Sequence, residues 1–317
     1  MSRRSRVRRG PRASTALACD GLTIRRSSRA RQARKPGVVL NRAMLHQDFT
    51  QTAVFEKVLS FIEPSDCVFA SFPKSGRTWV RFVLQHYASV RHGAAFDLRP
   101  RLIAGLSRFR SIVFTHDYFD FAFDTPGEPF IVFEPQMRKR GLVLLVRDPR
   151  DTIVSQFHWT TKHRKATGMP IDEFARSPIY GAERMADFVL KLLDAFEHHP
   201  GPKHLMIYEE CRKEPGTCFA ELLRFVDQES FSAEAASIAI DRSAFGRMQQ
   251  LEMAISQEGR VGDYRRIGVE SWDGDINALK VRRGAVGGYL EEAPWLNSDE
   301  FPLTRRLVET LHGLSRR

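Results

Sequence analysis

The sequence predicts a three-layer α/β domain built on a central parallel sheet. Short apolar runs alternate with longer helical patterns from about residue 55 onward. In residues 141–147 (GLVLLVR) the first six are continuously apolar, as central strands of parallel sheets are. Helical stretches of roughly ten to fifteen residues separate the runs, which is typical of βαβ units. A chain of 317 residues is long enough to hold one large domain of this kind.

The elements follow from local patterns. Apolar runs predict strands at residues 67–72, 111–116, 141–147 and 204–208. Helical stripes predict helices after the turn at residues 73–76, after Asp148, and over residues 183–196 and 219–226. At the second of these helix starts Asp148 is expected as N-cap, with Pro149 in the first turn.

The basic charge of the chain is concentrated at its N-terminus. Residues 1–42 hold twelve arginines, one lysine and one acid, a net charge of +12, which leaves −1 for the rest of a chain whose total is +11. Without apolar periodicity this stretch is predicted to be a disordered extension, followed by one domain over residues 43–317. It could contact nucleic acid or an anionic membrane, serve as a transit-like address, or precede a true start at Met44. The last interpretation is favoured.

Compartment and metal content are predicted from absences in the sequence. No charged segment leads into an apolar signal core, and the longest apolar run, residues 142–146, is too short to span a bilayer. Cys19, Cys67, Cys211 and Cys218 lack metal-site spacing, so free thiols in a reducing cytosol are expected. The sequence therefore predicts a cytoplasmic protein without a metal site.

Residues 71–79 (SFPKSGRTW) connect an apolar strand to a helix, a place where backbone N–H groups and the helix dipole converge on an anion. Lys74 and the hydroxyls would add donors. The spacing departs from a Walker A loop because Lys74 precedes Gly76. From the spacing alone, an anion site and an ordinary strand–turn–helix corner are equally favoured.

The string PKSGRTW resembles the 5′-phosphosulfate loop of the sulfotransferases that use PAPS (3′-phosphoadenosine 5′-phosphosulfate), usually PKSGTTW, with Arg77 in place of Thr. The resemblance extends over most of the chain, from about residue 67 to 289. It implies that the loop binds the phosphosulfate through Lys74, Ser75, Gly76, Arg77, Thr78 and Trp79.

A second stretch, residues 144–155, is similar to the 3′-phosphate motif of the same family, an Arg at a strand end and a Ser eight residues on. An arginine at the end of a central strand can bind a phosphate through two hydrogen bonds. If this stretch is considered alone, the simpler interpretation is that Arg147 pairs with Asp151 and that Ser155 faces a neighbouring helix. Beside the first loop, the phosphate site is favoured.

Three further strings resemble parts of the family's nucleotide pocket. Tyr208-Glu-Glu is similar to its Tyr-Glu-Asp, whose Tyr contacts the adenine side. Residues 243–248 are similar to its Thr/Ser-x-Phe-x-x-Met, and residues 282–289 to its Arg-Lys-Gly-x-x-Gly-Asp-Trp, which closes over the 3′-phosphate. The departures are Arg283 for Lys, Gly288 for Asp and Tyr289 for Trp. The resemblance implies nucleotide contacts by Tyr208, Ser243, Phe245, Met248, Arg282, Arg283 and Gly284.

His116 ends the strand at residues 111–116 and matches the His of the family's Lys-Thr-His string. The resemblance implies that His116 is the general base for in-line transfer of the sulfuryl group, with PAP (3′-phosphoadenosine 5′-phosphate) as product. Lys74 and the loop N–H groups would stabilise the leaving oxygen. Phe114 stands where the family has Lys, and we hypothesise that Arg77 supplies the missing cation.

The acceptor is left open by the sequence. A hydroxyl or amine of a small molecule, lipid or glycan would suit the aromatic and basic residues around Phe157, Trp159, His163 and Arg164. Two polar loops, residues 163–170 and 256–274, are predicted lids. The oligomeric state, including a homodimer, is also open.

Two other functions are alternatives to sulfuryl transfer. An ATP-dependent phosphotransferase would need a Gly-Lys-Ser/Thr loop, which the sequence lacks. It would also need a magnesium-binding Asp at a strand end, but Asp148, which follows such a strand, is expected to cap a helix. A nucleotide-binding module whose basic tail binds nucleic acid would show binding that falls steeply with salt. The near-neutral domain argues against a nucleic-acid partner.

Overall fold

The computed structural model describes residues 66–94, 96, 101–103, 105–116, 139–163, 168–257, 279 and 281–316. The predicted N-terminal extension, Met44 and most of the two predicted lids lie outside the described residues. In the part of the chain that is described, no helix is long and apolar enough to cross a membrane.

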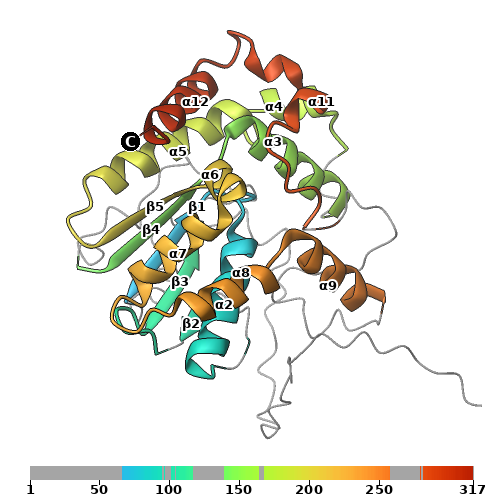
Figure 1. Ribbon diagram of the computed structural model, residues 1–317. Helices are drawn as coiled ribbons and strands as arrows, with labels where there is room; N and C mark the ends of the chain where they lie inside the picture. The colour runs from blue at the N-terminus through green and yellow to red at the C-terminus, as the bar shows by residue number, and fades with distance from the viewer. Residues whose placement is uncertain are drawn as a thin grey trace, which may run out of the picture. The chain divides into compact units, whose positions relative to one another are not determined.

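A five-stranded sheet with the order β2-β3-β1-β4-β5 forms the centre of the domain (Figure 1). Four strands are parallel, which confirms the predicted fold class: β1 (Cys67–Ser71), β3 (Ser111–Thr115), β4 (Gly141–Val146) and β5 (Lys203–Ile207). The edge strand β2 (Arg101–Ile103) pairs antiparallel with β3. It was not predicted, because three residues are too few to show a periodicity.

Side chains of the central strands alternate between two separate hydrophobic cores, as the period of two in a strand requires. In β1, Val68 and Ala70 face one core, whereas Cys67 and Phe69 face the other. Strand β4 alternates in the same way, and its six residues are all buried. Both faces of the sheet are therefore covered, which explains why residues 141–146 read as continuously apolar.

Helices cover the two faces as outer layers (Figure 1). One layer contains α2 (Arg77–His92), α7 (Pro215–Val226) and α8 (Ala233–Arg242). The other contains α3 (Pro149–His158), α5 (Ala182–Glu197) and α12 (Pro302–Leu314). Shorter or peripheral helices are η4 (Trp159–His163, a π-helix), α4 (Ile171–Arg176), α6 (Tyr208–Lys213), α9 (Phe245–Gln257), α11 (Tyr289–Glu292) and η7 (Pro294–Asn297).

Helix starts are fixed by local and by distant side chains. As predicted, Asp148 caps α3 by accepting a hydrogen bond from the Arg150 N–H at 2.9 Å, with Pro149 in the first turn. Helix α12 lacks a cap of its own and uses Glu183 of α5, whose carboxylate accepts from the N–H groups of Leu303 and Thr304 at 2.9 Å each. This contact fastens the C-terminal helix to its layer.

The expectation of free thiols is wrong for two cysteines. Cys211 in α6 and Cys218 in α7 form a disulfide, with their Cα atoms 5.1 Å apart. The short turn between the two helices brings the two cysteines within bridging distance. Their separation of seven residues in the sequence does not predict this turn. Cys67 is a buried free thiol, as expected, and burial raises its pKa.

Candidate functional site

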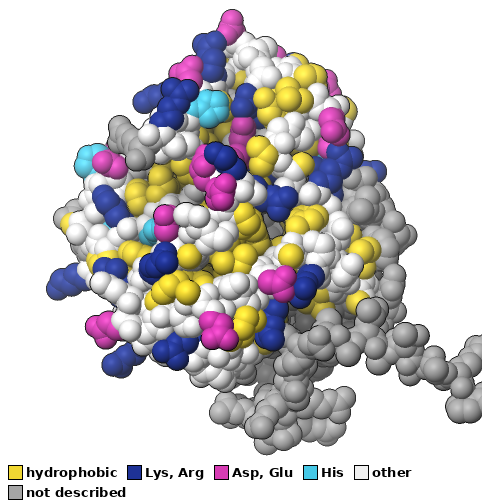
Figure 2. Space-filling model, viewed as in Figure 1, with side chains coloured by type: hydrophobic (Ala, Val, Ile, Leu, Met, Phe, Trp, Pro, Cys, Tyr) yellow, Lys and Arg dark blue, Asp and Glu magenta, His cyan; other side chains and the backbone are white. Residues whose placement is uncertain are grey.

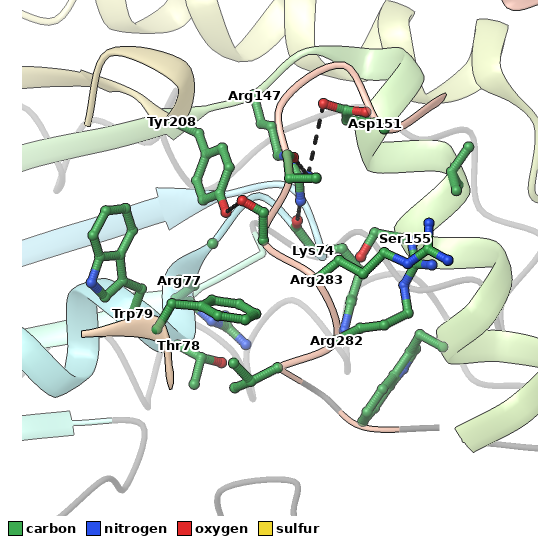
Figure 3. Close-up of a pocket in the computed structure, with 18 of the residues that line it drawn as sticks. Lys74, Arg77, Thr78, Trp79, Arg147, Asp151, Ser155, Tyr208, Arg282 and Arg283 are labelled. Atoms are coloured by element: carbon green, nitrogen blue, oxygen red, sulfur yellow. Dashed lines mark hydrogen bonds and ion pairs between the residues drawn. The ribbon is translucent and has the colours of Figure 1, made fainter. Parts of the chain in front are cut away.

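A pocket opens where the parallel strands end at their carboxyl side. It is lined by residues that follow β1, β3, β4 and β5, and by residues 281–292, which we call the strap. Figure 3 shows Tyr208, Trp79 and Thr78 on one side of this pocket, and Ser155, Arg282 and Arg283 on the other.

Most residues singled out from the sequence lie together in this pocket. They are Lys74, Gly76, Arg77, Thr78, Trp79, His116, Arg147, Ser155, Tyr208, Phe245, Met248, Arg282, Arg283 and Gly284. Two others do not line it. The Ser75 side chain is 2% exposed within the loop, and Ser243 is fully buried at the end of α8.

The N-terminus of α2 opens on the pocket without a side-chain cap. Gly76 is the N-cap residue, makes no side-chain cap hydrogen bond, and the first turn holds no acidic residue. Lys74 (φ 68°) and Gly76 (φ 103°) both have left-handed backbone on either side of Ser75. This conformation points successive N–H groups toward one place, so the loop offers backbone donors and a helix dipole to an anion.

Position 76 requires glycine both because its backbone is left-handed and because a side chain there would collide with a neighbouring ring. A Cβ at this position would lie 2.6 Å from Cδ2 of the Tyr208 ring. On the far side of that ring, the Tyr208 hydroxyl donates to the Gly284 carbonyl at 3.2 Å. Tyr208 thereby spaces the loop between β1 and α2 from the strap.

Arg147 links the loop to the strap. Its Nη1 donates to the Lys74 carbonyl at 3.1 Å and its Nη2 to the Ala285 carbonyl at 3.0 Å. The guanidinium lies over the Tyr208 ring, 4.4 Å from its centroid, and 4.0 Å from the Asp151 carboxylate. The sequence predicted a phosphate ligand. The side chain lines the pocket, but its first contacts are backbone carbonyls.

Aromatic rings form one wall of the pocket. Trp79 packs edge to face against Phe219 and Tyr208, with centroids 4.7 and 6.1 Å apart. The Arg212 guanidinium lies 5.6 Å from the Trp79 ring and 5.7 Å from the Phe245 ring. The indole Nε1 of Trp79 is buried without a hydrogen-bond partner among the described residues. This wall suits a flat aromatic ligand that carries an acceptor.

The strap is fastened to α3 by one carboxylate. Asp151 accepts from the N–H groups of Gly287 at 2.8 Å and Tyr289 at 2.9 Å. The sequence offered Asp151 only as a possible ion-pair partner of Arg147. Its role as the anchor of a segment 136 residues away has no local signal.

His116 and Lys74 both line the pocket. The His116 Nδ1 lies 2.7 Å from the Ser71 carbonyl, which can only accept, so Nδ1 carries the proton and Nε2 is the basic nitrogen. The Lys74 ammonium lies 4.6 Å from the Trp159 ring centroid. Burial, more than the nearby Arg147 and Arg282, lowers the pKa of Lys74 to about 8.

Phe114 and Arg77 differ in where they point. Phe114 is 6% exposed, packs against Phe69 at 5.1 Å and lies under the Arg81 guanidinium at 5.5 Å, so it belongs to the core. Arg77, one turn before Arg81 on α2, lines the pocket. Burial first, and Arg81 second, lower the pKa of Arg77 to about 9.

Among the described residues, sequence reasoning missed three charged residues of the pocket: Asp151, Arg212 and Glu292. Arg212 lies four positions after Tyr208 on α6, so helical spacing from a known pocket residue could have found it. Glu292 ends α11 and has no such signal.

Comparison with known proteins identifies the family of the chain and its fold. A family model described as a sulfotransferase domain matches residues 64–284. The crystal structure of mouse sulfotransferase SULT7A1 complexed with PAP matches with a TM-score of 0.50 and 18% identity, covering 80% of this chain and 92% of that one, which shows a shared fold. Since the family model spans most of the chain and contains the loop, α3 and α6, the chain belongs to the sulfotransferase family.

Proposed function

We propose that this sulfotransferase takes its sulfuryl group from PAPS and transfers it to a hydroxyl or amine of a small-molecule, lipid or glycan acceptor. The observation that supports this most is that two anion-binding groups line one pocket. The bare N-terminus of α2 with Lys74 forms the first. The second is formed by Arg147 and Ser155 together with the strap residues Arg282 and Arg283. A nucleotide with anions at both its 5′ and 3′ positions fits that arrangement.

The charge of the pocket suits such a nucleotide. Of the residues that the structure describes, six cationic side chains line it, against two carboxylates, Asp151 and Glu292. PAPS carries about four negative charges at neutral pH, counting its 3′-phosphate as a dianion. Elsewhere, on the face drawn in Figure 2, Lys and Arg are interspersed with Asp and Glu. The excess of positive charge lies in the pocket, which favours the binding of a small anionic nucleotide there over the binding of nucleic acid across a broad surface.

In the proposed reaction His116 removes the proton of the acceptor through Nε2 as the acceptor attacks sulfur. The Ser71 carbonyl holds the imidazole in the required tautomer. Lys74, with a pKa of about 8, is mostly protonated at pH 7 and donates to the oxygen between sulfur and the 5′-phosphate. The loop N–H groups stabilise the same developing charge.

Arg77 is proposed to supply a further cation near the sulfuryl group. Position 114 cannot do so, because the Phe114 side chain is packed in the core. With a pKa of about 9, Arg77 remains charged at pH 7. Its place in the first turn of α2 sets it beside the loop N–H groups.

Nucleotide-dependent thermal stabilisation tests the donor. PAP at one hundred times its dissociation constant should add about 2.7 kcal/mol to the free energy of unfolding. AMP, which lacks the 3′-phosphate, should add much less at the same concentration, and so should ATP. Stabilisation by ATP with magnesium but not by PAP would favour the phosphotransferase alternative.

Transfer itself is tested by incubating the chain with PAPS and panels of phenols, sugars and lipid headgroups, and measuring PAP released. Acceptor-dependent PAP formation is the expected result. Binding of PAP without transfer to any acceptor class would leave a nucleotide-binding module as the better description.

A further inference from the structure

Both arginines of the strap are already paired with carboxylates. Arg282 Nη1 donates to the Glu292 carboxylate at 3.0 Å. Arg283 Nη1 lies 3.1 Å from Glu291 and 3.5 Å from Glu292. The strap thus carries its cations at one end and their counter-charges ten residues later, on α11. An anion that binds Arg282 must compete with Glu292.

Glu292 differs from Glu291 in its position. The Glu292 side chain is 22% exposed and lines the nucleotide pocket, whereas that of Glu291 is 74% exposed and does not. A carboxylate inside the pocket is close enough to repel a phosphate held by the same guanidinium, and partial burial weakens the solvent screening between them.

Glu292 also has an alternative partner. Its second oxygen lies 2.5 Å from Nε2 of His158, at the end of α3, and the His158 side chain is 12% exposed. The other imidazole nitrogen, Nδ1, is buried without a hydrogen-bond partner in the described part of the chain. Among the described residues, the charged groups that act on this pair are Arg282 and Arg283 of the strap. If Arg282 turns to a ligand, His158 can keep the carboxylate in place.

We propose that Glu292 is an internal competitor for the 3′-phosphate of the nucleotide: it holds Arg282 in the empty site, gives it up when the nucleotide binds, and is then retained by His158. This inference rests on the proposed function. Glu292 is a positioning residue that tunes nucleotide affinity and the release of PAP. The product PAP carries the same 3′-phosphate as the donor PAPS. A contact that weakens the binding of this phosphate speeds the release of PAP and therefore its exchange for PAPS.

The test is calorimetric titration of the full chain with PAP and with AMP. Glu292→Gln keeps the shape and a hydrogen-bonding oxygen but removes the charge. It should bind PAP about tenfold more tightly and release it more slowly, while AMP affinity stays within about twofold. The matched control Glu291→Gln removes the neighbouring exposed charge and should stay within about twofold for both nucleotides.

His158→Phe gives the opposite sign. Without its alternative partner Glu292 should hold Arg282 more firmly, so PAP binding should weaken several-fold. The double variant His158→Phe/Glu292→Gln should recover the tight binding of Glu292→Gln, since the competitor is gone. Loss of affinity in the double variant would instead indicate structural damage around α3 and would count against the role given to His158.

The possible outcomes distinguish a failure of the inference about Glu292 from a failure of the proposed function. If wild type binds PAP but Glu292→Gln binds it equally or less tightly, Glu292 is no competitor and the inference is overturned while PAPS use stands. Equal tightening of AMP binding would also overturn it, because the 3′-phosphate would not be the group affected. If wild type does not bind PAP, the proposed function fails first.

Discussion

Gly76→Ala tests the loop geometry on which the nucleotide site depends. The residue has φ 103°, and an added Cβ would lie 2.6 Å from the Tyr208 ring. Placing a non-glycine residue in left-handed backbone costs about 1–2 kcal/mol, and overpacking a buried ring costs typically about 1–3 kcal/mol. The smaller entropy of the unfolded alanine chain offsets about 0.4–1 kcal/mol. We expect a net loss of about 2–4 kcal/mol.

Gly93 is a matched control. It ends α2 with φ 65°, and an added Cβ would meet nothing within 4 Å. Gly93→Ala should therefore show the backbone cost alone, a net of about 1 kcal/mol or less. Urea denaturation followed by circular dichroism measures both variants. Because only Gly76→Ala displaces Tyr208, it alone should also lose PAP affinity. Equal losses of stability in the two variants would refute the claim that Tyr208 packing requires glycine here.

Further predictions concern the chemistry. His116→Ala should lower turnover by about 10²–10⁴-fold with PAP affinity retained in calorimetry; near-normal turnover would remove His116 from the mechanism. Arg77→Ala should lower turnover by about tenfold or more, measured as PAP formed under saturating PAPS, and unchanged turnover and PAPS affinity would show that Arg77 does not replace the missing cation. Since Lys74 must be protonated to donate and its pKa is lowered to about 8, kcat/KM should fall as pH rises through about 8. A profile that stays flat to pH 9 would contradict the donor role of Lys74.

Much of the site was predictable because it is built at the ends of strands. Apolar runs located β1, β3, β4 and β5 to within a residue or two. Parallel strands present their carboxyl ends at one edge, so Lys74, His116, Arg147 and Tyr208 were bound to meet once the strands were placed. The capping role of Asp148 was likewise local and was confirmed.

The predictions that failed, or that no local pattern supported, involve contacts between distant segments. The disulfide of Cys211 and Cys218 depends on a turn between two helices. The Arg147 guanidinium donates to the carbonyl of Ala285, 138 residues away, a contact that the sequence does not indicate. The pairing of Glu292 with His158 spans 134 residues. No periodicity or short sequence motif predicts any of these three contacts.

The sequence by itself determined the layers of the domain, the position of the loop between β1 and α2, and the identity of most groups that line the pocket. It could do so because hydrophobic periodicity and helix caps act over a few residues. Tertiary structure alone decided how those groups are paired. Whether Arg282 faces a carboxylate, whether Asp151 holds the strap and whether Phe114 or Arg77 reaches the pocket depend on how packed faces bring remote side chains together. The free energy of those contacts comes from burial and charge in the assembled domain, which no segment of the chain experiences on its own.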